Sequence, residues 1–376
     1  MSISGRATRS GTKNYGHNFP DKVDHEFYRL SNDRWISSVG LGTYLGDVND
    51  KVDEAYKTSI KTALLNGINL IDTAANYRFQ RSERLIGDVL EEVFEDTDIE
   101  RNQVVVATKG GYVGYDGDRP EEPLDYIQSN FIEPGVADEE DFTNSGHCLT
   151  RDYIEYQVHN SLKNLNLETI DLFYVQNPEE QFTNHSHEDV YDQLEGVFEL
   201  LEKLVEAGKI DSYGLSSWDG LRVHPENEKY LKLESVHERA IRAGGEDHNF
   251  QTVQLPFNLG MTEASTLATQ PIEGEPLTAL DACRCLDLSI ITAASIMQGK
   301  IAGNLPDRIR DNFSEFQTDV QRALQFNRST PGVTACLVGM STPEHVTENL
   351  ELSEVKPIDE ESFRDRFLEV VDDSHS

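Results

Sequence analysis

Residues 150–180 read TRDYIEYQVHNSLKNLNLETIDLFYVQNPEE, and they contain a helical pattern followed by a short apolar run. The apolar residues of the helical part recur at i, i+4, i+8 and i+11, which is one helical face: Ile154, Val158, Leu162 and Leu165. The run Ile170–Val175 is short and apolar and is followed by Asn-Pro, as a buried strand would be. This stretch therefore predicts a helix that packs on a parallel sheet.

The same alternation of helix and strand continues along the chain. Seven further strands are predicted at Val39–Leu41, Ile68–Ile71, Val104–Thr108, Ser212–Leu215, Thr252–Leu255, Ser289–Thr292 and Val333–Val338. One helical stripe extends from Val190 to Val205, and Gly208 follows it as a C-terminal cap should. Eight parallel strands, each followed by a helix, are the number that closes a barrel. We therefore predict an α/β fold with a single (β/α)8 TIM barrel.

The length of 376 residues suits one large α/β barrel or two ordinary domains, and the strand count favours one barrel over residues 25–355. The stretch FYRLSNDRWISS at 27–38 predicts a hairpin that caps the barrel bottom. Residues 1–24 are basic and rich in Ser and Gly, so we expect a flexible arm without a secretory signal. Residues 356–376 form an acidic C-terminal segment.

Two segments exceed the usual length of a loop, residues 110–150 and 218–250. The second has a helical pattern of its own. The first leaves the carboxyl end of a strand, on the barrel face where active sites lie. We therefore expect residues 110–150 to form a long loop over the barrel mouth, as a lid or specificity segment that brings His147 near a substrate.

The charge of the chain is its most unusual property, with 68 acidic against 33 basic residues and a net charge of −35. Such a surface repels phosphate backbones, so neither nucleic acid nor an anionic membrane is an expected partner. Salt screens the self-repulsion, with a Debye length of about 3 Å at 1 M. The acidic surface resembles that of proteins from salt-accumulating archaea and implies a halophilic archaeal source.

The cysteines and histidines suggest neither disulfides nor a metal site. The four cysteines are scattered without CxxC spacing, which is typical of reduced thiols in a cytoplasmic protein: Cys148, Cys283, Cys285 and Cys336. The pairs His185/His187 and His147/Cys148 lack a second pair at ligand spacing, so we interpret them as solvated loop residues and predict no metal. No apolar run approaches the roughly 18 residues that span a bilayer.

The glycines of Gly40–Gly46 give a GxGxxxG pattern with Asp72 at the end of the next strand, which imitates a dinucleotide-binding unit. The acid lies about 30 residues on instead of about 20, and acidic residues follow Gly46. A Rossmann unit is therefore disfavoured.

Three polar residues lie at or just beyond strand ends: Asp72, Tyr77 and Lys109. Singly, they could be a turn cap, a packed ring and a solvated loop charge. Parallel barrel strands bring such positions to one mouth. Together they could form a proton donor, because an ammonium beside a phenol lowers its pKa from about 10 and a carboxylate holds that ammonium.

These residues belong to an ordered set of motifs: GLGTY (40–44), IDTAANYRFQRSE (71–83), ATKGG (107–111), DLFYVQNPE (171–179), YGLSSWDG (213–220), VQLPFN (253–258) and TPEHVTENL (342–350). In this order they resemble an aldo-keto reductase, from about Phe27 to Leu352. The resemblance implies hydride transfer between NAD(P)H and an aldehyde, ketone or sugar alcohol group of a small molecule. It assigns proton donation to Tyr77, the lowering of its pKa to Lys109, and pairing with Lys109 to Asp72.

Gln176 departs from the family pattern, because the family usually has a histidine at the end of this strand. That histidine donates a hydrogen bond to the substrate carbonyl. The amide of Gln176 can still donate to this oxygen, but it does not titrate.

The resemblance also implies NADP as cofactor, with NAD possible. It assigns cofactor contacts to Gly42, Thr43, Tyr44, Asp72, Ser216, Ser217, Gln254, Ser295, Gln298, Gly339, Ser341, His345, Glu348 and Asn349. Two features depart from the pattern. Ala293 stands where an aromatic residue often stacks on the nicotinamide, and residues 339–345 contain no Lys or Arg for a 2′-phosphate.

Two alternatives follow from these departures and from the barrel itself. A weakly catalytic or non-catalytic cofactor-binding redox sensor is favoured by Gln176 and Ala293 and opposed by Asp72, Tyr77 and Lys109. A phosphate-binding barrel lyase is disfavoured, because a glycine-rich phosphate loop after the seventh strand is missing.

Overall fold

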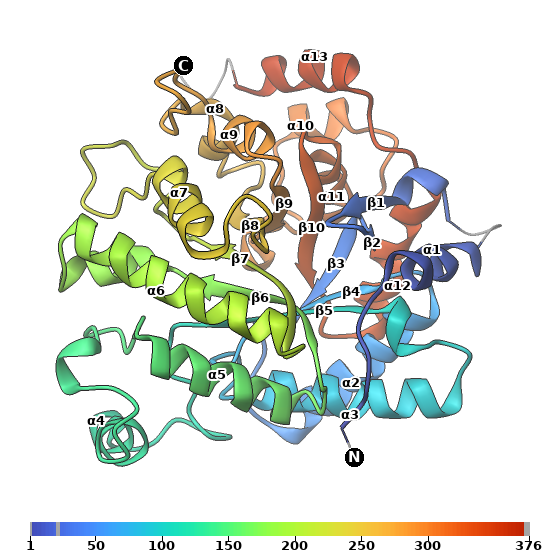
Figure 1. Cartoon of the computed structure of the whole chain (residues 1–376). Helices are drawn as coiled ribbons and strands as arrows, with labels where there is room; N and C mark the ends of the chain where they lie inside the picture. Colours follow the sequence, from blue (N-terminus) through green and yellow to red (C-terminus); the bar gives the residue numbers. More distant parts are fainter. Residues whose placement is uncertain (1, 20–22, 372–376) are drawn as a thin grey trace.

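Eight parallel strands close into a barrel (Figure 1). The computed structural model describes residues 2–19 and 23–371. The barrel strands are β3 (Val39–Gly42), β4 (Leu70–Asp72), β5 (Val105–Gly110), β6 (Ile170–Gln176), β7 (Ile210–Ser216), β8 (Phe250–Pro256), β9 (Ser289–Ala293) and β10 (Val333–Gly339). They follow one another in chain order, and β10 pairs with β3 to complete the ring. The predicted TIM barrel is confirmed.

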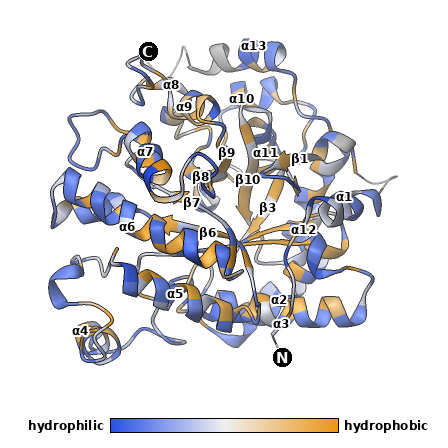
Figure 2. Ribbon diagram, viewed as in Figure 1, coloured by the Kyte–Doolittle hydropathy of each residue, from blue (hydrophilic) through white to orange (hydrophobic). Residues whose placement is uncertain are grey.

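Helices surround the barrel, and their apolar stripes face the strands (Figure 2). They include α2 (Asp50–Leu65), α3 (Arg81–Asp96), α5 (Arg151–Asn164), α6 (His187–Glu206), α7 (Leu233–Gly244), α9 (Ala279–Cys285), α11 (Asp319–Ser329) and α12 (Pro343–Leu350). In α6 the Ser186 hydroxyl accepts the N–H of Asp189, and the predicted stripe from Val190 is buried. Gly208 follows at φ +69°, where a residue without Cβ is favoured.

The predicted hairpin is formed by β1 (Tyr28–Ser31) and β2 (Arg34–Ser37). It caps the amino-terminal end of the barrel, where Arg34 donates to the main-chain oxygen of Asp171 at 2.7 Å. Strand β4 begins at Leu70 and not at Ile68 as predicted. The reason is Asn69, whose side chain accepts the N–H of Ser37 and donates to Trp35 O, both at 2.9 Å.

The N-terminal segment differs from the expected flexible arm. It contains α1 (Arg9–His17), and Tyr15 of this helix is fully buried with its hydroxyl donating to Leu64 O at 2.6 Å. The N–H of Ala7 donates to Asp171 Oδ1 at 2.7 Å. The arm is therefore a packed layer under the barrel, because one buried aromatic residue and its hydrogen bonds secure it. Residues 1 and 20–22 of the predicted arm lie outside the described residues.

The acidic C-terminal segment carries α13 (Glu360–Val371), and its Phe363 packs on Phe326 with ring centroids 5.5 Å apart. Residues 372–376 lie outside the described part of the chain. Two shorter helices, α8 (Glu263–Thr266) and α10 (Asp307–Asn312), lie in loops between β8 and α11. Within residues 2–19 and 23–371, no helix has the length and apolar character needed to cross a membrane.

The segment 110–150 has a hydrophobic cluster of its own beside the barrel. It contains α4 (Pro123–Ile127) and a π-helical turn at Gln128–Ile132. Its cluster is built from Val113, Ile127, Phe131, Ala137 and Cys148, and Tyr153 of α5 completes it. The segment is therefore a packed structure and not an irregular loop.

Candidate functional site

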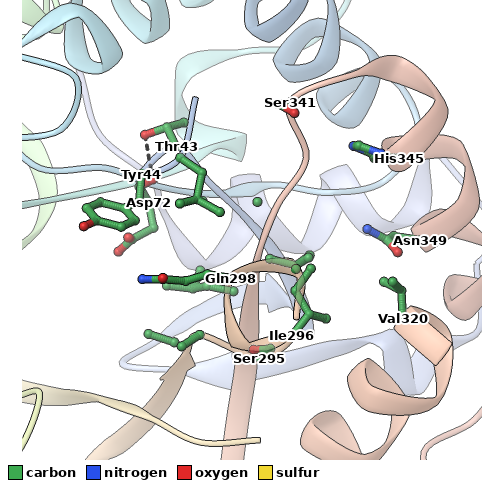
Figure 3. Close-up of a pocket in the computed structure, with 18 of the residues that line it drawn as sticks. Thr43, Tyr44, Asp72, Ser295, Ile296, Gln298, Val320, Ser341, His345 and Asn349 are labelled. Atoms are coloured by element: carbon green, nitrogen blue, oxygen red, sulfur yellow. Dashed lines mark hydrogen bonds between the residues drawn. The ribbon is translucent and has the colours of Figure 1, made fainter. Parts of the chain in front are cut away.

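A cavity of about 300 Å³ opens at the carboxyl-terminal face of the barrel. Its walls come from the ends of β3, β4, β8, β9 and β10, from the segments after them, and from α12. Figure 3 shows Thr43, Tyr44 and Asp72 on one side of the cavity and His345 and Asn349 on the other. None of the described residues that line it is a lysine or an arginine.

A buried ion pair lies at one end of the cavity. Asp72 is the last residue of β4, and Lys109 is in β5, so adjacent parallel strands place them side by side. Lys109 Nζ lies 2.5 Å from Asp72 Oδ1 and 2.8 Å from Thr73 O. Gln254 donates to Asp72 Oδ2 at 2.8 Å. Every charge in this pair is therefore satisfied by a partner, which a buried ion pair requires.

Tyr77 lies beside this pair, in the turn after β4. Its ring lines the cavity, and Lys109 Nζ is 4.9 Å from the ring centre. The ring also meets Tyr44 edge-on, with centroids 4.9 Å apart.

The pKa of Tyr77 is raised well above its usual value, first by burial and then by the charge of Asp72. The net shift of the Tyr77 pKa is therefore upward and not downward as predicted, because burial and Asp72 raise it and the Lys109 ammonium that lies over the ring face is balanced by Asp72. The phenol keeps its proton at neutral pH. Burial also raises the pKa of Asp72 and lowers that of Lys109. The charge of Lys109 opposes the rise at Asp72, and the charge of Asp72 opposes the fall at Lys109.

The turn that follows Tyr77 is strained in a way that the sequence did not indicate. Arg78, Phe79 and Gln80 have φ of 47°, 58° and 68°, so three successive non-glycine residues are left-handed. Arg78 pairs with Asp53 and donates to Asp47 O at 2.8 Å. Gln80 donates to Gly114 O at 2.8 Å, which joins the turn to the segment 110–150. These buried contacts stabilise the turn and with it the place of Tyr77.

Twelve of the fourteen residues assigned to the cofactor line this cavity: Gly42, Thr43, Tyr44, Asp72, Gln254, Ser295, Gln298, Gly339, Ser341, His345, Glu348 and Asn349. Ser216 and Ser217 are not among its lining residues. The hydroxyl of Ser216 donates to Gln254 Oε1 at 3.2 Å, and that of Ser217 donates to Glu179 Oε1 at 2.9 Å. In this structure the Ser217 hydroxyl therefore binds the carboxylate of Glu179.

The cavity walls have unused hydrogen-bonding capacity. Ser295 Oγ and Asn349 Oδ1 are buried without a hydrogen-bond partner among the described residues. Buried polar atoms are nearly always paired, so such atoms in a cavity wall indicate a polar ligand. Ile296, Val320 and Val338 supply apolar wall between them. The walls thus fit an elongated ligand with both apolar and polar parts, as a dinucleotide has.

Gln176 is the last residue of β6 and is only 8% exposed. Its Oε1 is buried without a partner among the described residues, and it is not one of the residues that line the cavity. Two residues after the following Asn177, the buried carboxylate of Glu179 accepts the main-chain N–H groups of Trp218 at 2.7 Å and of Asp219 at 3.0 Å. The motif DLFYVQNPE gave no indication that Glu179 binds the main chain of the loop after β7.

His147 is fully buried, which contradicts its interpretation as a solvated loop residue. It reaches the end of β6 because the segment 110–150 packs against the barrel. Across the described residues, no group of three or more His, Cys, Asp or Glu side chains is placed to hold a metal ion.

Comparisons with known proteins were made for sequence and structure. The model of the aldo/keto reductase family matches residues 38–236, more than half of the chain. Aldo-keto reductase YhdN of Bacillus subtilis (strain 168) is 32% identical over 187 residues, which are 48% of this chain and 44% of that protein. A putative voltage-gated potassium channel subunit beta of Schizosaccharomyces pombe is 23% identical over 331 residues, 85% of each chain.

The fold is also found among solved structures. The crystal structure of an aldo/keto reductase from Klebsiella pneumoniae in complex with NADP and acetate superposes with a TM-score of 0.59. The alignment covers 92% of this chain and 95% of that chain at 18% sequence identity.

Proposed function

The chain belongs to the aldo/keto reductase family, and on that basis we propose that it is an NAD(P)-dependent oxidoreductase of small molecules. It transfers a hydride between the nicotinamide and an aldehyde, ketone or sugar alcohol group, with Tyr77 as the proton donor. One observation carries the proposal. Tyr77 lines the cavity next to a buried Asp72–Lys109 pair.

The cofactor is NADP, which the Klebsiella structure also contains. When bound, it supplies or accepts the hydride. Asp72 and Gln254 border one part of its cavity, and Ser341, His345 and Asn349 another. Ser295 and Asn349 each offer it a buried polar atom that has no hydrogen-bond partner among the described residues. NAD is the alternative cofactor, because no Lys or Arg lines the described cavity.

Proton transfer falls to Tyr77. Hydride arrival on a carbonyl carbon leaves an alkoxide, which needs a donor within hydrogen-bond reach. The raised pKa of Tyr77 keeps the phenol protonated, and the growing alkoxide draws the proton. Lys109, whose charge Asp72 balances, then stabilises the phenolate from the ring face. Gln176 orients the carbonyl through its amide and does not exchange a proton.

A redox sensor or regulatory subunit is the second candidate function. Gln176 is not among the residues that line the cavity, and Ala293 offers no ring to the nicotinamide. The similarity to a putative potassium channel subunit beta favours the same function. The intact Asp72, Tyr77 and Lys109 oppose it.

Titration of the purified protein with NADPH and NADH in molar potassium chloride, followed by a screen of aldehydes, ketones and sugars, separates the two functions. Turnover that Tyr77→Phe abolishes supports the oxidoreductase. Tight cofactor binding without turnover on any carbonyl supports the sensor.

We also propose that the protein works in the salt-rich cytoplasm of a halophilic archaeon. The net charge of −35 and exposed carboxylates such as Asp50 and Asp307 support a salt-rich environment. The four cysteines, which are all free thiols, support a reducing compartment.

A further inference from the structure

The buried ring of His147 makes contact with the strand that ends in Gln176. His147 lies at the far end of the segment 110–150, and its Nε2 is 2.7 Å from the main-chain oxygen of Gln176. Gly111 makes this approach possible. A Cβ at Gly111 would come within 2.7 Å of both His147 Nε2 and Gln176 O. The first and last parts of the segment therefore meet at the end of β6.

The partners of His147 determine which nitrogen carries the proton. A carbonyl oxygen only accepts, so Nε2 is the N–H that donates to Gln176 O. On the other side, Gln181 Nε2 donates to His147 Nδ1 at 2.9 Å and to His147 O at 3.0 Å. The imidazole is thus neutral and held in one tautomer. Burial lowers its pKa to about 4, although the nearby carboxylate of Glu180 opposes this shift.

The peptide group between Gln176 and Asn177 is held from both sides. Its C=O accepts from His147, and its N–H donates to Ser216 O at 2.6 Å. Asn177 is left-handed, with φ of 45°, so the chain turns sharply at this point. The orientation of this peptide sets the direction in which the Gln176 side chain leaves the backbone. Without the His147 hydrogen bond, the C=O of this peptide loses its donor while the N–H keeps its bond to Ser216 O.

We propose that His147 is a positioning residue for Gln176, which fixes the peptide from which the amide reaches the substrate carbonyl. This inference rests on the proposed oxidoreductase function. It gives the segment 110–150 a second role besides substrate selection. Through His147, the segment supplies the hydrogen-bond donor to the main-chain oxygen of Gln176 at the end of β6. His147 itself is not among the residues that line the cavity and exchanges no proton in the reaction.

A double-mutant cycle tests this role. In the wild type, the ring of Tyr112 meets that of His147 edge-on. His147→Phe keeps a buried ring at this place but removes the N–H that donates to Gln176 O. In the wild-type background it should lower kcat/KM for carbonyl reduction about tenfold or more, as loss of alignment does, with the Kd for NADPH nearly unchanged. In the Gln176→Ala background it should have little further effect, because the aligned amide is already absent.

Two further variants separate positioning from stability. His147→Gln keeps an N–H donor at a similar reach and should restore most of kcat/KM. Phe131→Leu loosens the cluster of the segment without touching Gln176, so it should lower the Tm while kcat/KM stays near the wild-type value.

Equal losses from His147→Phe in both backgrounds, or no loss in either, overturn this inference alone. A wild type that turns over no carbonyl overturns the proposed function together with it. Nitrogen-15 chemical shifts give a readout that is independent of activity. A neutral Nε2–H tautomer of His147 at neutral pH supports the inference, and a charged ring or an Nδ1–H tautomer overturns it.

Discussion

Removing the ammonium of Lys109 should be among the most destabilising single changes in the barrel. Lys109→Met keeps most of the side-chain volume and leaves Asp72 with Gln254 as its one remaining side-chain donor among the described residues. Asp72 is only 3% exposed, so its carboxylate depends mainly on protein partners. Breaking a buried pair by removing one member costs about 3–5 kcal/mol. The free energy of unfolding should fall by this amount, measured by urea denaturation in molar potassium chloride.

The loss of stability in Lys109→Met should also depend on pH, and it should grow as the pH rises. Burial raises the pKa of Asp72 even beside Lys109, and without the ammonium it rises further. The folded variant then retains a proton that the unfolded carboxyl releases near pH 4. Its free energy of unfolding should therefore decrease as the pH rises from about 4 toward the folded pKa, by up to about 1.4 kcal/mol per pH unit.

Two controls make this prediction specific. Lys57 forms a pair with Asp88 at 3.0 Å on the surface, where its side chain is 28% exposed, and Lys57→Met should cost only about 0–1 kcal/mol. In the double variant Asp72→Asn with Lys109→Met, neither charge of this pair remains, so the pH-dependent part of the loss should disappear. The reasoning is refuted if Lys109→Met is no more destabilising than Lys57→Met, or if its loss does not grow with pH.

Three further predictions concern salt, the segment 110–150 and Gln176. The Tm should rise from low to molar potassium chloride, because salt screens the net charge of −35; an unchanged Tm would contradict the halophilic interpretation. Replacing residues 116–142 by a short linker should change the order of preference among carbonyl substrates while the Kd for NADPH persists; identical kinetics across several substrates would rule out a role in specificity. Gln176→His should keep activity and add a titration of kcat/KM near pH 6–7, because an imidazole titrates there and an amide does not. A pH profile that matches the wild type would argue against contact between this residue and the substrate.

The barrel could be predicted because its signals are local. Runs such as Ile170–Val175 and stripes such as Val190–Val205 report burial directly through their periodicity, and all eight strands were found near their predicted positions. Asp72 and Lys109 could be predicted to meet because strand ends of a parallel barrel share one face. The N-terminal arm was mispredicted, since the burial of Tyr15 depends on carbonyls of α2 and the segment after it.

The remaining site features depend on where side chains point and what they contact in the folded chain, which composition does not encode. Burial and the charge of Asp72 raise the pKa of Tyr77, whereas the Lys109 ammonium lies over the ring face and is bonded to Asp72. The burial of His147 requires a packed segment of its own, and Ser217 is taken up by Glu179 from another strand's loop. Each of these facts is a long-range contact, which spacing along the chain does not reveal.

The most direct test of the account is the turnover of Tyr77→Phe. The hydroxyl is the proposed proton source, so its removal should lower kcat for carbonyl reduction by a factor of roughly 10² or more. The Kd for NADPH should stay nearly unchanged, and Gln176→Ala should cost less, because it removes a donor but no proton source. Normal turnover of Tyr77→Phe, together with loss of activity in Gln176→Ala, would contradict the assignment of roles.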